Sequence, residues 1–498
     1  MELQLQKQPV KCLRTVVREL QSQEQTQEIR ISDGMPDIGS IIGAWGQVIL
    51  RSKEWETDCI RVSGGTMVWV QYLSEDGEER ATMESWLPFQ MQWKLQPGEN
   101  DGRIICQSYL KSVDARSISA RKMILRTGIA LFAEGLEPCA CDVFVPGSVP
   151  EDVQILTRRY PVQLPVEAGE KAFAVDELLT LPADSPGIAG IISYHLQPEV
   201  TEEKLMGDKL VFRGKAHLHM HYSCEEGMQH YRDLVLPFSQ YCELDSEYDQ
   251  ADTVRIWPCV TSLEAELQQN QIHLKAGLVC QYRICSSPVL EIIEDAYSNL
   301  RTVDCVRQTL ELPAILEAKS RNISAKANCD GDGMRMADVR FLLHPVTVQH
   351  RDDNAEVVLS GHFQPLYYGM EGELHSTDQQ WTETVTLPAN ENADIEASVS
   401  PTGMPQGNLM SGSGQLQTQL ELYTEARPKT GIPAVTALEL GELRQPDPKR
   451  PSLILKRSGE QSLWELAKDN GSTVELIRSA NDLHEEPEDN RMLLIPVV

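Results

Sequence analysis

The sequence predicts a mainly β fold in which three repeated β-sandwich-like domains are followed by a small βααβ domain. Three observations predict this fold class. Segments that alternate polar with apolar residues, or that are rich in β-branched residues, recur through the first 440 residues of the 498-residue chain. The chain also resembles itself at an offset of about 150 residues, and amphipathic helical patterns are few before residue 450.

The internal repeat is clearest between residues 36–75 and 186–225, which align without a gap. Matching positions carry a glycine, a tyrosine that ends a strand and, after a slip of one residue, a Leu-Pro-Phe step. These are Gly64 with Gly214, Tyr72 with Tyr222, and Leu87-Pro88-Phe89 with Leu236-Pro237-Phe238. A looser third copy has Gly361, Tyr368 and Leu387-Pro388 in the same order. The repeat predicts duplicated domains of the same topology.

The expected division of the chain follows this repeat. Residues 1–150 and 151–305 form β-rich units 1 and 2, and residues 306–440 form a divergent unit 3. Residues 441–450 form a Pro-rich linker to a last domain over residues 451–498. Because proline at this density favours an extended, semi-rigid chain, we expect the last domain to stand on a stalk, free to engage a partner.

The first half of the last domain is predicted from its strand and capping signals. Residues 452–457 form an apolar-centred strand. Ser462 and Glu465 form a capping box, in which the hydroxyl accepts from a helical N–H and the carboxylate reaches back. The helix that follows ends at Gly471, because glycine tolerates the left-handed closing conformation.

The second half repeats the signals in reverse order. Ser472 and Glu475 predict a second capping box, which opens a helix that runs to Asn481. Residues 492–496 form the closing strand, with Pro496 at its end, where no ladder donor is required.

This arrangement resembles a LysM domain. The resemblance is carried by the first helix, the second helix, the residues after it and the closing strand, at 462–468, 473–477, 480–483 and 494–496. It implies a βααβ fold and, as ligand, the N-acetylglucosamine backbone of peptidoglycan or chitin. The turn at 459–462 is one residue longer than the family's usual Gly-Asp-Thr, and the loop at 485–489 is strongly acidic and has no aromatic residue.

Because of these departures, a protein is a second candidate ligand of this domain beside the glycan. A neutral sugar chain is usually held by amide and hydroxyl donors and stacking surfaces, whereas carboxylates suit a basic protein surface. Trp464 either packs on the domain's own helices or anchors a partner, because tryptophan is enriched at interfaces. The candidate binding residues for either ligand are Gly459, Glu460, Gln461, Ser462, Trp464, Leu483, His484, Glu485 and Glu486.

Charge and cysteine content limit the class of function. The net charge of −29, spread along the chain, argues against nucleic acid and anionic lipid as partners, because both require clusters of Lys and Arg. Residues 1–17 contain no continuous apolar run, so we expect no signal peptide, and no apolar stretch approaches the length of a transmembrane segment. Twelve cysteines without Cys-x-x-Cys pairs indicate buried or idle thiols in a reducing cytoplasm.

One predicted strand carries a cluster of candidate metal ligands. His217, His219 and His221 alternate along one strand, with Cys224 close behind, and these ligand types suit zinc. In the repeat, however, these histidines align with residues on the face opposite the predicted core. We therefore expect a solvated sheet face and no metal. The chain also lacks the common nucleophile, phosphate-binding and zinc-protease motifs, so we expect no catalytic residues, no cofactor and no enzyme activity.

The whole chain resembles the SipL-type spore coat morphogenetic proteins of anaerobic endospore formers. The repeats with a Pro-Asp-Ile opening, the segment Ile-Glu-Asp-Ala-Tyr-Ser at 293–298 and the single C-terminal LysM carry this resemblance. It implies a non-catalytic scaffold in the mother-cell cytoplasm, at the forespore surface, whose LysM binds the SpoIVA-like ATPase of the coat basement layer. The alternative is a LysM protein that binds peptidoglycan or cortex glycan.

Overall fold

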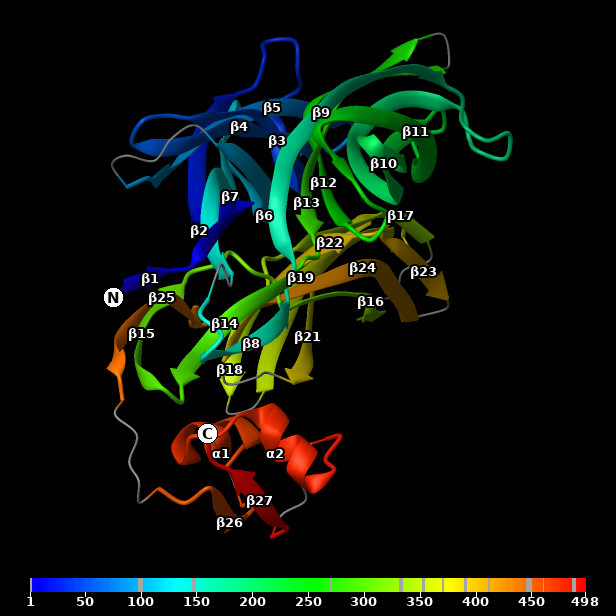
Figure 1. The fold of residues 1–498 in the computed structure, drawn as a ribbon. Helices are drawn as coiled ribbons and strands as arrows, with labels where there is room; N and C mark the ends of the chain where they lie inside the picture. The colour runs from blue at the N-terminus through cyan, green and yellow to red at the C-terminus, as the bar shows by residue number, and fades with distance from the viewer. Residues whose placement is uncertain are drawn as a thin grey trace.

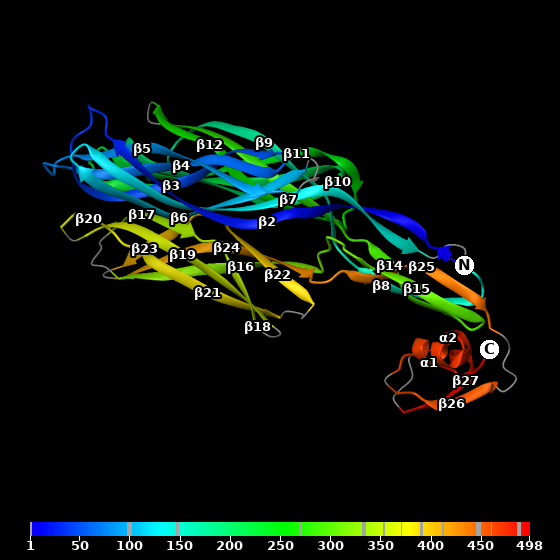
Figure 2. The ribbon, with the colours of Figure 1, turned by 90° about the vertical axis from the view of Figure 1, so that its left-hand side faces the viewer.

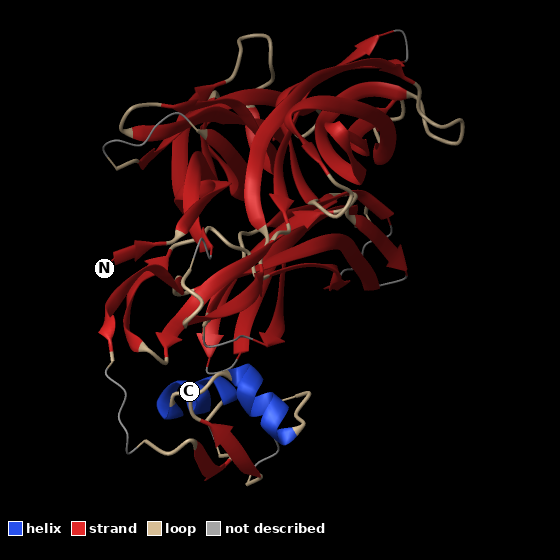
Figure 3. Ribbon diagram, in the orientation of Figure 1, coloured by secondary structure: helices blue, strands red, loops and turns tan. Residues whose placement is uncertain are grey.

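The computed structural model describes residues 2–96, 102–145, 149–268, 271–330, 335–351, 354–369, 371–388, 392–410, 413–444, 450–459, 461–485 and 490–498. Within these ranges the fold is mainly β, and the two helices both lie near the C-terminus, as Figure 3 shows in blue. The prediction of a mainly β fold is confirmed. Within the same ranges, no helix combines the length and the apolar character needed to cross a membrane.

Most strands fall into three groups, each with two antiparallel sheets whose apolar faces pack together. Group I has sheets ordered β3-β4-β5 and β2-β7-β6. Its strands are β2 (Gln6–Arg30), β3 (Ile38–Trp55), β4 (Cys59–Ser74), β5 (Arg80–Lys94), β6 (Arg103–Ser119) and β7 (Lys122–Val145).

Group II repeats this order, with sheets β10-β11 and β12-β13-β9. Its strands are β9 (Leu164–Leu179), β10 (Ile188–Cys224), β11 (Gln229–Tyr248), β12 (Thr253–Gln268) and β13 (Gln271–Ser286). The long β10 occupies the places of both β3 and β4. It folds back at Gly207, where φ is +64°, so that Ser223 Oγ donates to Gly190 O at 3.3 Å.

Group III has the same order with shorter strands, in a β17-β19-β18 sheet that β20 and β21 extend and a β16-β24-β22 sheet that β23 extends. Its strands are β16 (Glu317–Asp330), β17 (Arg335–Leu343), β18 (Thr347–Arg351), β19 (Asn354–Tyr368), β20 (Leu374–Ser376), β21 (Gln379–Pro388), β22 (Ala393–Pro401), β23 (Gln406–Met410) and β24 (Ser413–Pro428). Figures 1 and 2 show group III beneath groups I and II.

The repeated glycine occupies the same local setting in groups I and II. In the strand register, Gly64 lies opposite Phe89, and Gly214 lies opposite Phe238. A Cβ at Gly64 would lie 2.1 Å from Ile49 O, and one at Gly214 would lie 2.2 Å from Glu199 O. Both positions therefore require glycine because a neighbouring strand and an aromatic ring cover them.

The third copy agrees with the alignment only in part. Gly361 lies under the ring of Phe341 and pairs with Trp381, so its crowding resembles that of the other two glycines. The Leu387-Pro388 step instead ends β21 opposite Asn354, seven pairs away from Gly361. The proposed match of this step was wrong, because β20 and β21 divide the strand and change its register.

Strands between the groups assemble into two further sheets, β1-β25-β15 and β14-β8, which we call the junction. They are β1 (Glu2–Gln4), β8 (Val153–Pro161), β14 (Val289–Ser298), β15 (Arg301–Leu310) and β25 (Ile432–Leu443). The expected boundaries after residues 305 and 440 fall inside β15 and β25. The junction therefore draws strands from all three expected units, and Figure 2 shows it at one end of the molecule.

A buried ion cluster lies where the three groups meet. Arg283 of group II donates from Nη1 to both carboxylate oxygens of Glu134 in group I, at 3.0 and 3.2 Å, and from Nη2 to Glu425 in group III. Arg18 and Arg427 flank these carboxylates, at 2.7 Å from Glu134 Oε1 and 2.8 Å from Glu425 Oε2. Both arginines also reach Glu396, so three cations face three carboxylates.

The electrostatics of this central ion cluster favour the charged forms of Glu134 and Glu425, whereas burial raises the pKa of Glu396. Burial raises the pKa of Glu425, but the guanidinium groups of Arg283, Arg427 and Arg18 outweigh burial and lower this pKa to about 2. The Arg283 side chain is almost completely buried and lies over the Trp257 ring at 5.4 Å. Removing Arg283 would leave Glu134 and Glu425 buried with no cation between them, although Arg18 and Arg427 would remain beside them.

We expect Arg283→Met to lower the free energy of unfolding by about 3–5 kcal/mol, since it leaves two buried carboxylates facing each other. Arg159→Met is the matched control. Its partner Glu291 lies 2.9 Å away in an exposed pair, so the loss should be about 0–1 kcal/mol. Chemical denaturation of both variants measures the difference. Equal losses would contradict a structural role for the cluster.

Candidate functional site

The C-terminal module, the described residues from 450 to 498, has the predicted order of strand, helix, helix and strand. Its elements are β26 (Leu453–Arg457), α1 (Leu463–Asn470), α2 (Val474–Asn481) and β27 (Met492–Pro496), with β26 paired to β27. Leu463, Leu466, Ile477, Leu493 and Ile495 form its buried core. The predicted strand and helix positions are confirmed to within one residue.

The first predicted cap is confirmed. Ser462 Oγ accepts from Glu465 N, and the Glu465 carboxylate accepts from Ser462 N at 2.9 Å. Gly471 closes α1 with a φ of +65°. The second capping box was wrong, because Thr473 rather than Ser472 caps α2 and accepts from Leu476 N. Ser472 is buried instead, and its carbonyl accepts hydrogen bonds from outside the module.

The structure brings the two loops of the predicted binding site to one end of the module. Ser458, which precedes the first loop, bonds through its main chain to Asn490 and Arg491, which follow the second. Gly459, Gln461, His484 and Glu485 are exposed there. Leu483 belongs to the core, and Ser462 is used in the cap. Glu460, Glu486 and the carboxylates of Glu488 and Asp489 lie outside the described residues.

Trp464 contacts the junction rather than solvent. Its indole Nε1 donates to Asp295 Oδ2 at 2.9 Å, and its ring meets the Tyr297 ring edge-on at 4.7 Å. Lys468 Nζ donates to the same Asp295 oxygen at 2.6 Å. Trp464 was expected to pack on the module's own helices or to anchor a partner protein. The contacts with Asp295 and Tyr297 were not expected, because they join the module to another part of the same chain. Trp464 packs against β14, in the Asp-Ala-Tyr part of the segment that the sequence singled out.

A second pair of contacts fixes the other end of α1. Tyr297 Oη and Asn299 Nδ2 both donate to Ser472 O at 3.0 Å. Tyr297 is part of the same buried cluster as the module's core residues. The expectation of a module free on a stalk was therefore wrong, because β14 and the turn after it hold the module through hydrogen bonds and apolar burial. Figures 1 and 2 show the module beside the junction strands.

The outer face of the β26–β27 hairpin carries an exposed apolar patch. Inward and outward residues alternate along these two paired strands. We call the four exposed apolar residues on the outward face the hairpin patch: Leu453, Leu455, Met492 and Leu494. Leu455 is 61% exposed and lies opposite Leu494 in the strand register. The alternation is readable in the sequence, but β27 is apolar throughout and β26 has leucine or isoleucine on both faces, so the sequence could not show which face was free.

His219 and His221 of β10 are buried and His217 is half-buried, so the expectation of a solvated sheet face was wrong. The two ring nitrogens of His219 each lie 2.6 Å from a carboxylate oxygen, Nδ1 from Asp233 Oδ1 and Nε2 from Asp338 Oδ1. His221 Nε2 lies 3.0 Å from Gln229 Oε1. Asp338 comes from β17 of group III. The face is covered because group III packs on it, which a comparison of repeats within one domain could not predict.

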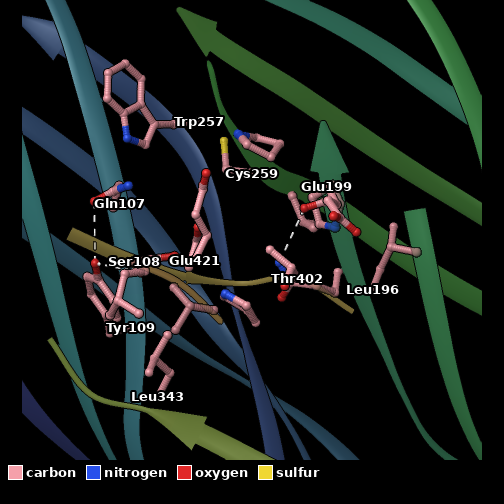
Figure 4. Close-up of a pocket in the computed structure, with 18 of the residues that line it drawn as sticks. Gln107, Ser108, Tyr109, Leu196, Glu199, Trp257, Cys259, Leu343, Thr402 and Glu421 are labelled. Carbon is pink, nitrogen blue, oxygen red and sulfur yellow. Dashed lines mark hydrogen bonds between the residues drawn. The ribbon is translucent and has the colours of Figure 1, made fainter. Parts of the chain in front are cut away.

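A cavity of about 640 Å³ lies between the groups. Figure 4 shows Gln107 and Tyr109 of group I, Trp257 and Cys259 of group II, and Glu421 of group III around it. Its volume lies in the range of small-molecule sites. Burial raises the pKa of the Cys259 thiol to about 11, so this thiol stays protonated near neutral pH. Glu421 is paired with Arg255 at 2.6 Å.

Comparisons with models of protein families, with curated proteins and with solved structures find no match to this chain.

We expect Asp295→Ala to release the C-terminal module, because it removes the shared acceptor of Trp464 and Lys468. Hydrogen bonds to a charged group contribute about 1.5–3 kcal/mol each, so opening should increase tenfold or more. Limited proteolysis between residues 444 and 451 and the radius of gyration in solution report this opening. Asp304→Ala, an exposed carboxylate on β15, is the control. Unchanged cleavage in Asp295→Ala would contradict the docking.

A pH dependence follows from His221, which is completely buried. Burial lowers its pKa to about 4, although Asp338 opposes the shift and Arg340 and His219 reinforce it. Below about pH 6.5 the unfolded chain binds a proton that the folded chain refuses, so stability falls as pH falls towards 4, by up to about 1.4 kcal/mol per pH unit. Denaturation of the wild type and His221→Gln between pH 7 and 4.5 should give a shallower slope for the variant. Equal slopes would exclude His221 as a source.

Proposed function

We propose that this chain is a non-catalytic scaffold of spore coat assembly. In this proposal the three strand groups are diverged copies of one β-sandwich-like unit, and the C-terminal module is a LysM domain. The scaffold acts in the mother-cell cytoplasm at the forespore surface, and its LysM domain binds a SpoIVA-like coat ATPase. The hairpin patch is the observation that carries the binding role.

The recurrence of one strand order supports the duplication. The crowded glycines Gly64 and Gly214 each lie against a partner strand and beneath the phenylalanine of the Leu-Pro-Phe step. Tyr72 and Tyr222 are both completely buried, each eight positions after its glycine. Equivalent contacts at equivalent positions are expected of copies that share a fold.

The hairpin patch supports a protein as the ligand. Four large apolar side chains on one two-stranded sheet form a surface whose burial is favourable at about 25 cal/mol per Å². In the described part of the chain, β26 and β27 pair only with each other, so each also offers a free edge for an added strand. The net charge of −29 favours a partner with a basic surface, which would speed association.

The alternative is a LysM domain that binds peptidoglycan or cortex glycan at the loop end. The exposed Gln461 and His484 could donate hydrogen bonds to a sugar. Against this alternative, Trp464 packs edge-on against Tyr297 and the Ser462 hydroxyl is used in the helix cap. The loop end therefore has fewer groups available for a glycan than the sequence suggested.

The test is binding of the full chain to the purified coat ATPase and to insoluble peptidoglycan. Leu455→Glu should weaken ATPase binding roughly fivefold or more, about 1 kcal/mol, because it places a charge in the centre of the patch. Leu178→Glu, on β9, is the matched control, because Leu178 is 55% exposed and distant in sequence. Retention by peptidoglycan, with ATPase binding absent or indifferent to Leu455→Glu, would favour the alternative.

A further inference from the structure

Three cysteine thiols converge where group I meets the junction. Cys12 lies on β2 and faces Cys139 of β7 in the strand register. Cys141 is two residues further along β7, so its side chain projects from the same face. The Sγ atom of Cys12 lies 3.1 Å from that of Cys139 and 3.8 Å from that of Cys141.

The surroundings of this thiol cluster are apolar and partly closed. Cys12 is buried, whereas Cys139 and Cys141 are half-buried. The thiols pack with Val143, Leu164 and Leu290, which come from three different strands. Cys141 Sγ also donates to the carbonyl of Glu311, 3.6 Å away, in the segment that follows β15. An ion held here would therefore lie between β2, β7 and the junction.

The spacing of the three sulfur atoms matches that of thiolates around one metal ion. All three Sγ atoms lie within 4.8 Å of one another. A tetrahedral zinc ion with Zn–S bonds of about 2.3 Å holds its sulfur ligands about 3.8 Å apart. The Cys12–Cys141 distance already has this value, and Cys139 has to move by less than about 1 Å, which a χ1 adjustment supplies.

We propose that Cys12, Cys139 and Cys141 bind a thiophilic divalent cation, Zn²⁺, as three thiolates. Water or the Glu311 carbonyl completes the coordination. Binding displaces the thiol protons to solvent, so affinity rises with pH. The ion cross-links β2 to β7 and adds stability to the fold. The proposal does not depend on the function proposed above.

The electrostatics of the cluster agree with such a site. A hydrogen bond from the Cys12 thiol, with help from the Arg14 guanidinium, lowers the pKa of Cys139 to about 7. The pKa of Cys12 is raised, first by its hydrogen bond to Cys139 and then by burial. A divalent cation reverses this effect, because a coordinating thiol is deprotonated.

The test is a cobalt and zinc titration of the full chain, prepared metal-free under reducing, anaerobic conditions. Co²⁺ should bind with one equivalent and give near-ultraviolet thiolate-to-cobalt absorption, which zinc then abolishes. Cys139→Ser and Cys141→Ser should each weaken zinc binding tenfold or more in competition with a chromophoric chelator. Cys224→Ser, which removes a buried thiol of group II, should bind as the wild type does.

Two further measurements separate loss of metal binding from loss of folding. Circular dichroism of the metal-free variants shows whether each is folded, and zinc should raise the melting temperature of the wild type but not of Cys141→Ser. Absence of cobalt–thiolate absorption in the wild type would overturn the proposal. So would wild-type zinc affinity in Cys139→Ser, or a Cys12–Cys139 disulfide recovered by mass spectrometry from the reduced preparation.

Discussion

Charge balance in the central ion cluster constrains how the three strand groups fit together. Arg283 is buried between carboxylates from the other two groups, and desolvating it is tolerable only while both remain in place. Glu134 and Arg283 are 149 residues apart, the same offset that relates Leu87 to Leu236. Equivalent positions of two similar groups thus carry opposite charges. This difference favours the observed arrangement over one in which Glu134 and Glu425 would meet without Arg283 between them.

The interfaces between groups also explain which sequence-based predictions succeeded. The order of strands and helices in the C-terminal module, the capping box at Ser462 and the closing glycine of α1 depend on neighbours close in sequence. The structure confirms all three. The β10 histidines, Trp464 and the module's freedom depend on surfaces from distant segments. Asp338 lies 119 residues from His219, and Asp295 lies 169 residues from Trp464. A hydrophobic pattern shows which face of a sheet faces the core of its own domain. It does not show whether a distant segment packs on the opposite face.

The candidate binding site shows the same division. The structure brings the loops around Gly459 and His484 to one end of the module, because the two strands fix that geometry. The hairpin patch was missed, since β26 and β27 are apolar on both faces and either face could have been the inner one. Only the position of the helices decides it: α1 and α2 cover Leu493 and Ile495 and leave Leu455 and Leu494 outside.

The pairing of β1 with β25 brings Glu2 opposite Glu439, near the two extremes of the sequence. Contacts of such long sequence separation form late, because loop closure must precede them. During synthesis β1 emerges hundreds of residues before its partner β25, so the β1-β25-β15 sheet is completed only after the three strand groups have been translated. The surface against which the C-terminal module docks belongs to this same junction. Completion of the junction is thereby coupled to translation of the strand groups, and a chain that stops before β25 retains β14 but leaves the neighbouring junction sheet unfinished.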